Sequence, residues 1–257
     1  MNRLDNLFAT GKRNLLNIYC TAGFPEIDST LKVLQALEDN GADIAEIGMP
    51  YSDPLADGPV IQQSNKTALE NGMTISLLFK QLENLRPQIK IPVILMGYLN
   101  PVLQYGVEKF CEAAMRVGVD GLIIPDLPVH EFTLAYKAVF EKYNLRFTFL
   151  VTPETAEDRI SLLDKSSSGF LYAVSSSSTT GSGKSLEEQA GYLGRLRDMQ
   201  LSNPVLVGFG ISDAAGFRKV CEYARGAIVG SAYIRALQAG GDIGAVTRDF
   251  LNGLNGR

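Results

Sequence analysis

The chain has 257 residues, of which 46% are hydrophobic and 20% are charged, and its net charge is −4. This length suits either two ordinary domains or one α/β barrel. The acidic balance argues against nucleic acid or an anionic membrane as the main partner. No apolar run approaches the ~18 residues of a membrane span. The start of the chain does not resemble a secretory signal, so the cytoplasm is the expected location.

Eight short apolar runs alternate with amphipathic stretches from one end of the chain to the other. The runs are continuously apolar, as is typical of parallel strands that are covered on both faces. Eight βα units without a linker predict a (β/α)8 TIM barrel, an α/β fold, as one domain over residues 1–257. The expected strands are Leu15–Cys20, Ile44–Gly48, Pro92–Met96, Gly121–Ile124, Phe147–Val151, Phe170–Val174, Val205–Gly208 and Ala227–Gly230.

The intervening stretches have helical periodicity, with glycine after several of them and Ser, Thr or Asp before several. An extra N-terminal helix, Leu4–Thr10, is expected to plug one end of the barrel. A doubly wound open sheet is the alternative fold, but it normally has a glycine-rich fingerprint after its first strand, which Cys20–Pro25 is not. The other expected helices are Asp28–Asn40, Ile75–Leu85, Val107–Val117, Glu131–Lys142, Thr155–Asp164, Leu186–Met199, Ala214–Tyr223 and a final pair within Ala232–Leu251.

The cysteines and the single histidine do not suggest a metal site. Cys20, Cys111 and Cys221 are odd in number and lack metal-ligand spacing, so they are expected to be reduced, mostly buried thiols. His130 has no cysteine or second histidine near it in the sequence. A helix start at the surface is the preferred interpretation for it, over a ligand or a general base.

Glu46 lies in a predicted strand, on the face that points into the protein. A buried carboxylate costs several kcal/mol unless it is paired or its pKa rises. Such a residue suits chemistry in which a proton is held and released near neutral pH. The alternative is that an Arg or Lys satisfies Glu46 in a structural ion pair.

A second acid, Asp57, follows in a loop that Pro50, Pro54 and Pro59 restrict, because proline fixes φ. In a TIM barrel the active site is built at the carboxyl ends of the strands. Glu46 and Asp57 are both expected there, which predicts an acid/base pair. The alternative for Asp57 is a turn former in a polar loop.

Glycines follow the last two predicted strands, in Gly208–Ser212 and Gly230–Ala232. Glycine lets backbone N–H groups approach an anion, and a helix N-terminus adds unpaired donors. The loops after strands seven and eight commonly hold a phosphate in such barrels. We therefore expect a phosphate site made of backbone groups.

The segment Thr179–Ser185 is similar to the end of a nucleotide-binding P-loop, but Ser178 stands where the first glycine is required. It also follows the sixth strand of a barrel and not the first strand of an open sheet. A lid that closes over the site is the preferred interpretation of this Ser/Thr/Gly-rich loop.

Over essentially its whole length the chain resembles the tryptophan synthase α subunit. The most specific part is Glu46–Gln62, and further matches are Leu95–Pro101, Pro125–Pro128, Gly208–Ser212 and Gly230–Ala232. That family cleaves indole-3-glycerol phosphate to indole and glyceraldehyde 3-phosphate. It passes the indole to a β subunit that carries pyridoxal phosphate. The resemblance implies an α2β2 heterotetramer and no cofactor in this chain.

The resemblance also implies roles for individual residues. Glu46 would be the general acid/base, and Asp57 would accept a hydrogen bond from the indole N–H. Partner contacts would come from Pro50–Asp53 and Leu99–Tyr105. The other implied positions are Tyr172 near the scissile bond, the apolar indole slot of Tyr19, Met96, Tyr98, Ile123 and Phe209, and the phosphate ligands Gly181, Gly210, Gly230 and Ser231.

The loop after the sixth predicted strand departs from the family pattern. Ser176 and Ser178 stand where the family usually has an Arg and a Gly, whereas Thr180 and Gly181 match. Two other functions are compatible with a barrel of this kind. A phosphosugar isomerase would usually need acid/base groups on strands one and five, where Cys20, Thr21, Val151 and Thr152 offer no carboxylate. A barrel that mainly binds and regulates a partner is the non-enzymatic alternative.

Overall fold

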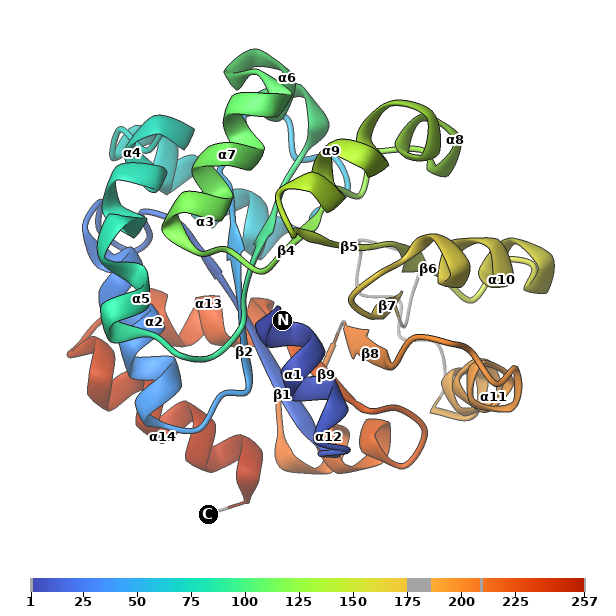
Figure 1. The fold of residues 1–257 in the computed structure, drawn as a ribbon. Coiled ribbons are helices and arrows are strands. Elements are labelled where there is room, and N and C mark those ends of the chain that lie inside the picture. The colour runs from blue at the N-terminus through green and yellow to red at the C-terminus, as the bar shows by residue number, and fades with distance from the viewer. Residues whose placement is uncertain (1, 175–185, 209, 257) are drawn as a thin grey trace.

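The computed structural model describes residues 2–174, 186–208 and 210–256, and only the backbone of residues 186–189. In these residues parallel strands alternate with helices, and the helices surround the sheet as an outer ring (Figure 1). Repeated βα units wind a parallel sheet into a barrel of this kind. The predicted TIM barrel with an extra N-terminal helix is therefore confirmed.

The described residues form one sheet in the order β5-β4-β3-β2-β1-β9-β8-β7-β6, in which every recorded pair is parallel. Apart from one break, the strands agree with the prediction to within one residue at each end. Their bounds are β1 (Leu15–Thr21), β2 (Ile44–Gly48), β3 (Val93–Met96), β4 (Gly121–Ile123), β5 (Arg146–Thr148), β6 (Leu150–Val151), β7 (Leu171–Val174), β8 (Val205–Gly208) and β9 (Gly226–Val229).

The break divides the predicted fifth strand into β5 and β6, so the prediction of one continuous strand is wrong. β5 pairs with β4, and β6 pairs with β7. Between them the Phe149 N–H donates to the Ser167 hydroxyl at 3.2 Å, while the Phe149 carbonyl accepts the N–H of Tyr172 at 2.9 Å. A side chain thus replaces one backbone partner at this point. β5 and β6 are the two outermost strands in the sheet order, and Phe149 joins them along the chain.

The inward side chains form an apolar cluster, called here the barrel-interior cluster. Leu4 of helix α1 (Arg3–Ala9) belongs to it, and α1 lies across the barrel in Figure 1. β4 begins at Gly121, and a Cβ added to this glycine would lie only 3.1 Å from Leu4 Cδ1. Helix α1 therefore closes the amino end of the barrel. The carboxyl end is left for the site. The cluster consists of Leu4, Leu15, Ile44, Ile94, Ile123, Phe170, Leu206 and Ile228.

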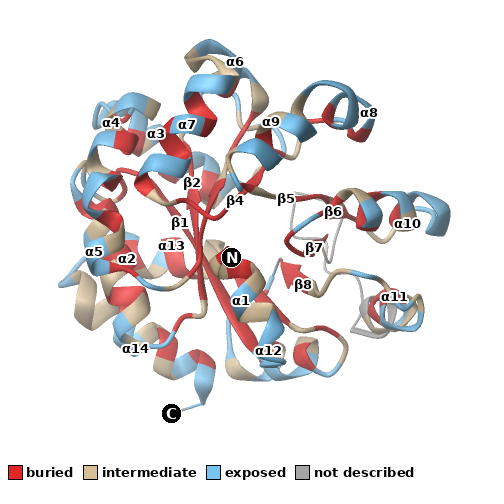
Figure 2. Ribbon diagram, viewed as in Figure 1, coloured by how far each residue is buried: buried red, intermediate tan, exposed pale blue. Residues whose placement is uncertain are grey.

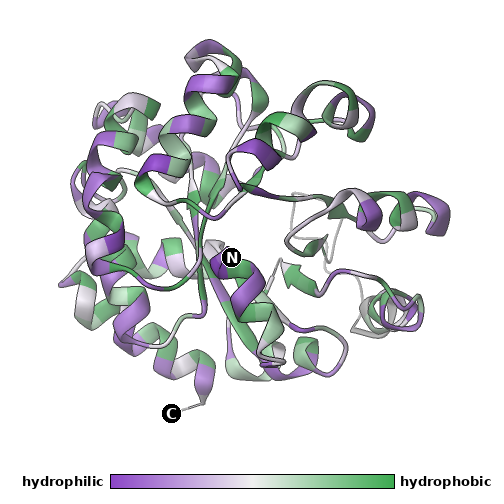
Figure 3. Ribbon diagram, viewed as in Figure 1, coloured by the Kyte–Doolittle hydropathy of each residue, from purple (hydrophilic) through white to green (hydrophobic). Residues whose placement is uncertain are grey.

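The outward side chains of the strands pack against the helices in a larger apolar cluster. Figure 2 shows buried strands inside a ring of helices whose outer faces are exposed, and Figure 3 shows that those outer faces are largely hydrophilic. On β2, Ile44 faces the interior, whereas Ala45 and Ile47 belong to the outer cluster. The predicted alternation of β2 is therefore confirmed, and it directs Glu46 inward.

The helices differ from the prediction in four places. Helix α3 was not predicted: Pro59, expected to stiffen a loop, is its first residue, a position that proline favours because no N–H is needed there. Helix α6 was also not predicted. The expected helices Ile75–Leu85 and Glu131–Lys142 are each interrupted, by the 3-10 turn η1 and the π-helical η2.

The helical elements have the following bounds, in addition to α1. They are α2 (Ser29–Asp39), α3 (Pro59–Glu70), α4 (Ile75–Gln81), η1 (Leu82–Asn84), α5 (Leu85–Gln88), α6 (Leu99–Tyr105), α7 (Val107–Val117), α8 (Val129–Glu131), η2 (Phe132–Tyr136), α9 (Lys137–Lys142), α10 (Glu157–Ser166), α11 (Leu186–Asp198), α12 (Ala214–Cys221), α13 (Ser231–Gln238) and α14 (Ile243–Asn255).

The expectations for the cysteines and the histidine agree with the structure. Cys20, Cys111 and Cys221 are buried free thiols. His130 is exposed in α8, at the start of a helical segment. Among the described residues no helix is both long and apolar enough to cross a membrane.

Candidate active site

Glu46 is the most unusual side chain of the barrel interior. It is 1% exposed on β2, and its Oε2 accepts a hydrogen bond from Asn17 Nδ2 at 2.9 Å. Its Oε1 has no hydrogen-bond partner among the described residues. Burial raises its pKa to about 8; the Asn17 hydrogen bond opposes this rise, and the charge of Asp57 adds to it. At neutral pH Glu46 is mostly protonated and can act as an acid.

Asp57 lies just before α3, in the loop that follows β2. Its Oδ2 accepts a hydrogen bond from the Tyr98 hydroxyl at 3.3 Å, and the same hydroxyl accepts the N–H of Ala56 at 2.9 Å. Burial raises the pKa of Asp57 to about 6, against the opposing effect of the Tyr98 hydrogen bond. Asp57 is therefore mostly ionised at pH 7. The two acids have pKa values on opposite sides of neutrality, which separates their possible roles.

The buried Tyr19 and the partly buried Tyr172 interact with both acids. Burial raises the pKa of Tyr19 and of Tyr172 well above the ordinary value, and the charges of Glu46 and Asp57 raise both further. Tyr19 is also the register partner of Glu46 across β1 and β2. The structure thus brings these four predicted residues together at the carboxyl ends of the strands.

Glycines on neighbouring strands make room for the two tyrosine rings. A Cβ at Gly48 would lie 1.9 Å from the Tyr19 hydroxyl oxygen, and one at Gly208 would lie 2.2 Å from that of Tyr172. Both distances are far below contact, so an alanine at either position would displace a ring. Gly230 lies close to Tyr19 as well, with a Cβ position 3.4 Å from the Tyr19 Cβ.

The remaining apolar positions line the same end of the barrel, as far as the structure describes them. Met96 ends β3 and is the register partner of Ile123 on β4. Ile123 belongs to the barrel-interior cluster, against which Met96 packs. Tyr98 reaches Asp57, as described above, and its ring centroid lies 5.2 Å from that of Tyr51. Phe209 lies outside the described residues.

The predicted phosphate site is described in part. Gly230 caps α13 without a side-chain hydrogen bond, and Ser231 is the first residue of that helix. The first N–H groups of a helix have no acceptor within the helix, so they are available to an anion. Gly210 has φ +74° and open space at its Cβ position, a conformation that favours glycine. Gly181, the 175–185 loop with Ser176 and Ser178, and the predicted lid lie outside the described residues.

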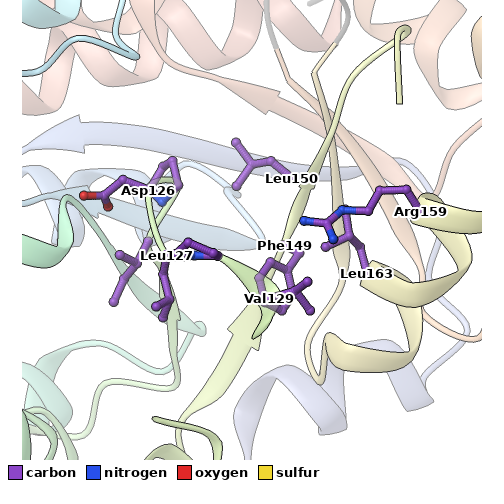
Figure 4. A pocket seen from close by; sticks show the side chains of 10 residues that line it. Asp126, Leu127, Val129, Phe149, Leu150, Arg159 and Leu163 are labelled. Carbon is purple, nitrogen blue, oxygen red and sulfur yellow. The ribbon is translucent and has the colours of Figure 1, made fainter. Parts of the chain in front are cut away.

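A separate hollow lies outside this cluster (Figure 4), between the segment after β4, the β5–β6 junction and α10. Leu127, Val129 and Phe149 contribute apolar walls, and Asp126 and Arg159 extend from different sides. The Asp126 carboxylate already accepts the Leu99 N–H at 2.9 Å. No predicted site residue lines this hollow.

Asn17 is the polar residue that the sequence prediction missed. It is fully buried on β1 and is the residue that hydrogen-bonds Glu46. A signal was present: two-residue periodicity directs Asn17 and Tyr19 to the same face, and an amide is out of place in an apolar strand. No group of three His, Cys, Asp or Glu side chains that could hold a metal ion occurs in the described part of the chain.

Comparison with known proteins gives a consistent result. The family model for the tryptophan synthase alpha chain matches residues 5–250. The tryptophan synthase alpha chain of Flavobacterium johnsoniae is 51% identical over 94% of this chain and 95% of its own, and that of Parabacteroides distasonis is 48% identical over 93% of each. The crystal structure of tryptophan synthase subunit alpha from Legionella pneumophila has a TM-score of 0.89 and 34% identity, covering 100% of this chain and 98% of that one.

The TIM barrel combines three features: an acid that is neutral at pH 7, an ionised acid beside it, and a helix N-terminus that is free for an anion. Together they define a class of protein, an enzyme that moves protons on a phosphorylated substrate. The particular family follows from the matches. The chain belongs to the tryptophan synthase alpha chain family, whose activity is the carbon–carbon lyase step of tryptophan biosynthesis and whose partner is the β subunit.

Proposed function

We propose that Glu46 and Asp57 carry out the cleavage of indole-3-glycerol phosphate in this protein. The observation that carries the proposal is that burial raises the pKa of the two acids unequally, that of Glu46 to about 8 and that of Asp57 to about 6. At pH 7 one acid holds a proton to give and the other holds a negative charge.

The reaction balances with these two groups alone. Glu46 gives its proton to C3 of the indole ring, which leaves a positive charge on the ring system. Glu46 then takes the proton of the hydroxyl on the adjacent glycerol carbon, the bond from C3 to that carbon breaks, and its electron pair restores the indole. Glyceraldehyde 3-phosphate leaves as the aldehyde, and Glu46 ends protonated, as it began.

Asp57 stabilises the intermediate by accepting a hydrogen bond from the indole N–H. A fixed anion at the point where positive charge develops is a large contribution to catalysis. Tyr98 holds the Asp57 carboxylate in place by the hydrogen bond at 3.3 Å. The indole ring would lie between the acids, against Tyr19, Met96, Ile123, Tyr172 and Phe209.

The phosphate would be bound by backbone N–H groups near Gly230 and Ser231, with Gly181 and Gly210 as further ligands. In support, the first turn of α13 carries no side-chain cap. The positive end of the helix dipole favours an anion there. No cofactor is proposed in this chain; pyridoxal phosphate belongs to the β subunit.

The β subunit would dock on a surface formed by Pro50–Asp53 and by α6, to which we add the nearby Leu55. Two observations support this surface. Its two parts contact each other, since Asn100 Nδ2 donates to the Tyr51 hydroxyl at 3.4 Å. It also presents apolar side chains to solvent, Leu55 at 85% and Leu103 at 47% exposure.

Leu55→Asp tests the docking surface, with Leu134→Asp as the matched control because Leu134 is 71% exposed and lies on η2, which is not one of the segments proposed to form this surface. We expect Leu55→Asp to weaken β-subunit binding about tenfold or more, as a buried interface position would, and Leu134→Asp to leave it unchanged. Equal affinities in a titration would refute the surface.

The reaction is tested by assaying the purified protein on indole-3-glycerol phosphate with and without a β subunit. We expect indole formation, and a bell-shaped pH dependence of kcat/KM with limbs near 6 and near 8, since Asp57 must be ionised and Glu46 protonated. A profile flat between pH 5 and 9 would contradict the roles. No turnover under either condition would favour a regulatory barrel.

The proposal also covers the setting of the enzyme. We propose that the chain forms one (β/α)8 domain over residues 1–257 and works in the cytoplasm. The three free thiols are of the kind expected in a reducing compartment. Fractionation of cells that produce the protein would test the location.

A further inference from the structure

The side chain that touches Glu46 has no evident structural purpose of its own. Asn17 is fully buried, and its only recorded side-chain hydrogen bond within the described residues is the one from Nδ2 to Glu46 Oε2 at 2.9 Å. Its Oδ1 has no partner among them. Leaving a buried amide oxygen unsatisfied destabilises a fold, so an apolar residue would serve the barrel better here.

The surroundings of Asn17 make the point sharper. Its register partners are Ile44 on β2 and Ile228 on β9, both members of the barrel-interior cluster. The side chains on either side of it on the same face of β1 are Leu15 and Tyr19. The Asn17 amide lies in an apolar layer and donates to the Glu46 carboxyl. Its effect on that carboxyl explains why an amide is present here.

We infer that Asn17 is a positioning residue, which holds one oxygen of Glu46 through both protonation states and leaves the other oxygen to the substrate. This inference rests on the role proposed for Glu46. The Asn17 amide has a donor end and an acceptor end. When Glu46 is ionised, the NH₂ group donates to Oε2, as in the structure.

When Glu46 is protonated, its proton is on Oε1, the oxygen left to the substrate, and Oε2 is the carbonyl oxygen of the neutral acid, which still accepts from Asn17 Nδ2. The same hydrogen bond therefore holds Oε2 in both protonation states, and Oε1, which has no partner among the described residues, stays open. Glu46 therefore stays in place while one proton leaves and another returns, as the proposed cycle requires once in each turnover.

The groups that interact with the Glu46 charge come from three directions. They are Tyr19 and Cys20 on β1, Asp57 in the loop after β2, and Tyr172 on β7. Burial raises the pKa of the two tyrosines and of Cys20, the last to about 12, so they stay neutral across the working range. Asp57 and Glu46 are left to titrate, and the Asn17 side chain makes its one hydrogen bond recorded among the described residues to Glu46.

Asn17→Leu tests the inference, since leucine has similar size but no hydrogen-bonding group. We expect kcat to fall about ten- to a hundredfold, the loss of one hydrogen bond to a charged group, with little change in KM. The upper limb of the pH profile should move to higher pH, because the hydrogen bond that favours ionised Glu46 is gone. The lower limb, which belongs to Asp57, should stay in place.

Asn17→Asp is the second variant and keeps the size and shape of the side chain. A second carboxyl beside Glu46 disfavours its ionisation, so the upper limb should again move up. Ile228→Val is the matched control, a truncation in the same layer that does not touch Glu46; its kcat and both limbs should match those of the parent protein.

Two results would overturn the inference: an unmoved upper limb in either folded Asn17 variant, or a fall in kcat that Ile228→Val shares. If Asn17→Leu fails to fold, Asn17→Asp decides. Failure of the underlying proposal looks different, because then the parent protein would lack lyase activity or Glu46→Gln would retain it.

Discussion

Two acids are buried at opposite ends of the barrel, and their surroundings are opposite. Asp120, at the amino end, is 2% exposed and accepts hydrogen bonds from Arg86 at 2.6 Å, Arg3 at 3.2 Å and the Val93 N–H at 2.9 Å. Glu46, near the carboxyl end, is 1% exposed and has one amide as its recorded partner. No ion pair to Glu46 is recorded within the described residues.

The difference separates a structural acid from a catalytic one. Arginines at Asp120 compensate the buried charge and join α1 and α5 to the sheet. At Glu46 no recorded cation compensates a negative charge within the described residues, so ionisation of the buried carboxyl is unfavourable and its pKa rises to about 8. A carboxyl that is easily neutralised is of little use for holding elements together, but it can exchange a proton at neutral pH.

The sharpest test of the comparison is Glu46→Gln, which keeps the size of the side chain and removes its proton chemistry. We expect indole formation to fall about 10²–10⁴-fold, the usual contribution of a positioned acid or base. The free energy of unfolding at pH 7 should not decrease, because a neutral amide suits the buried position better than a carboxyl. Turnover close to that of the parent protein would remove Glu46 from the mechanism.

Asp120→Asn should have the reverse effect. Removing the charged partner of Arg86, whose side chain is 15% exposed, leaves that arginine without its ion pair, which costs about 3 kcal/mol of unfolding free energy. Activity per folded molecule, measured at low temperature, should be close to normal because Asp120 is at the other end of the barrel. A stable but inactive variant would contradict the assignment. Denaturant unfolding and enzyme assays on one preparation distinguish the outcomes.

The pH dependence of stability should differ between the parent protein and Glu46→Gln. The pKa of Glu46 is raised from 4.5 to about 8 on folding, so the folded state binds more protons than the unfolded state between these values. Stability must therefore fall as the pH rises from about 4.5 to about 8. Subtracting the Glu46→Gln curve isolates this contribution. A difference curve that is flat, or that rises with pH, would mean that Glu46 is not held neutral.

The smallest effect is expected at an exposed acid. Asp28 pairs with Lys32 on α2 at 2.7 Å, but the side chains are 62% and 56% exposed. Solvent and salt screen such a pair, so Asp28→Ala should change neither the melting temperature nor indole formation measurably. A clear loss of thermal stability or of indole formation in Asp28→Ala would contradict this expectation. It would show that the distance between paired charges, and not their burial, accounts for the contrast between Glu46 and Asp120.

Much of the fold and of the pair of acids could be predicted from the sequence, because both depend on local patterns. Alternating βα units define the barrel, and two-residue periodicity directs Glu46 inward. Helix α3 was missed because a proline such as Pro59 is compatible with both a loop and the first residue of a helix.

Other features depend on partners that are distant in the sequence. The break at Phe149 depends on the Ser167 hydroxyl, which replaces a strand partner. Asn17 becomes significant only when β1 and β2 are paired, because that pairing brings its amide to Glu46, 29 residues along the chain. The pattern of β1 alone marks Asn17 as an inward-facing amide, but it does not show which carboxyl that amide contacts.

The close fit of Gly48 under Tyr19 and of Gly208 under Tyr172 has an evolutionary consequence. At each pair the barrel mouth has room for one large side chain and no more. A lineage that enlarges one of these glycines must shrink the opposing ring first, or lose function on the way. The two positions of a pair should therefore change together or not at all, so that a homologue with a bulkier residue at position 48 would carry a smaller one at position 19.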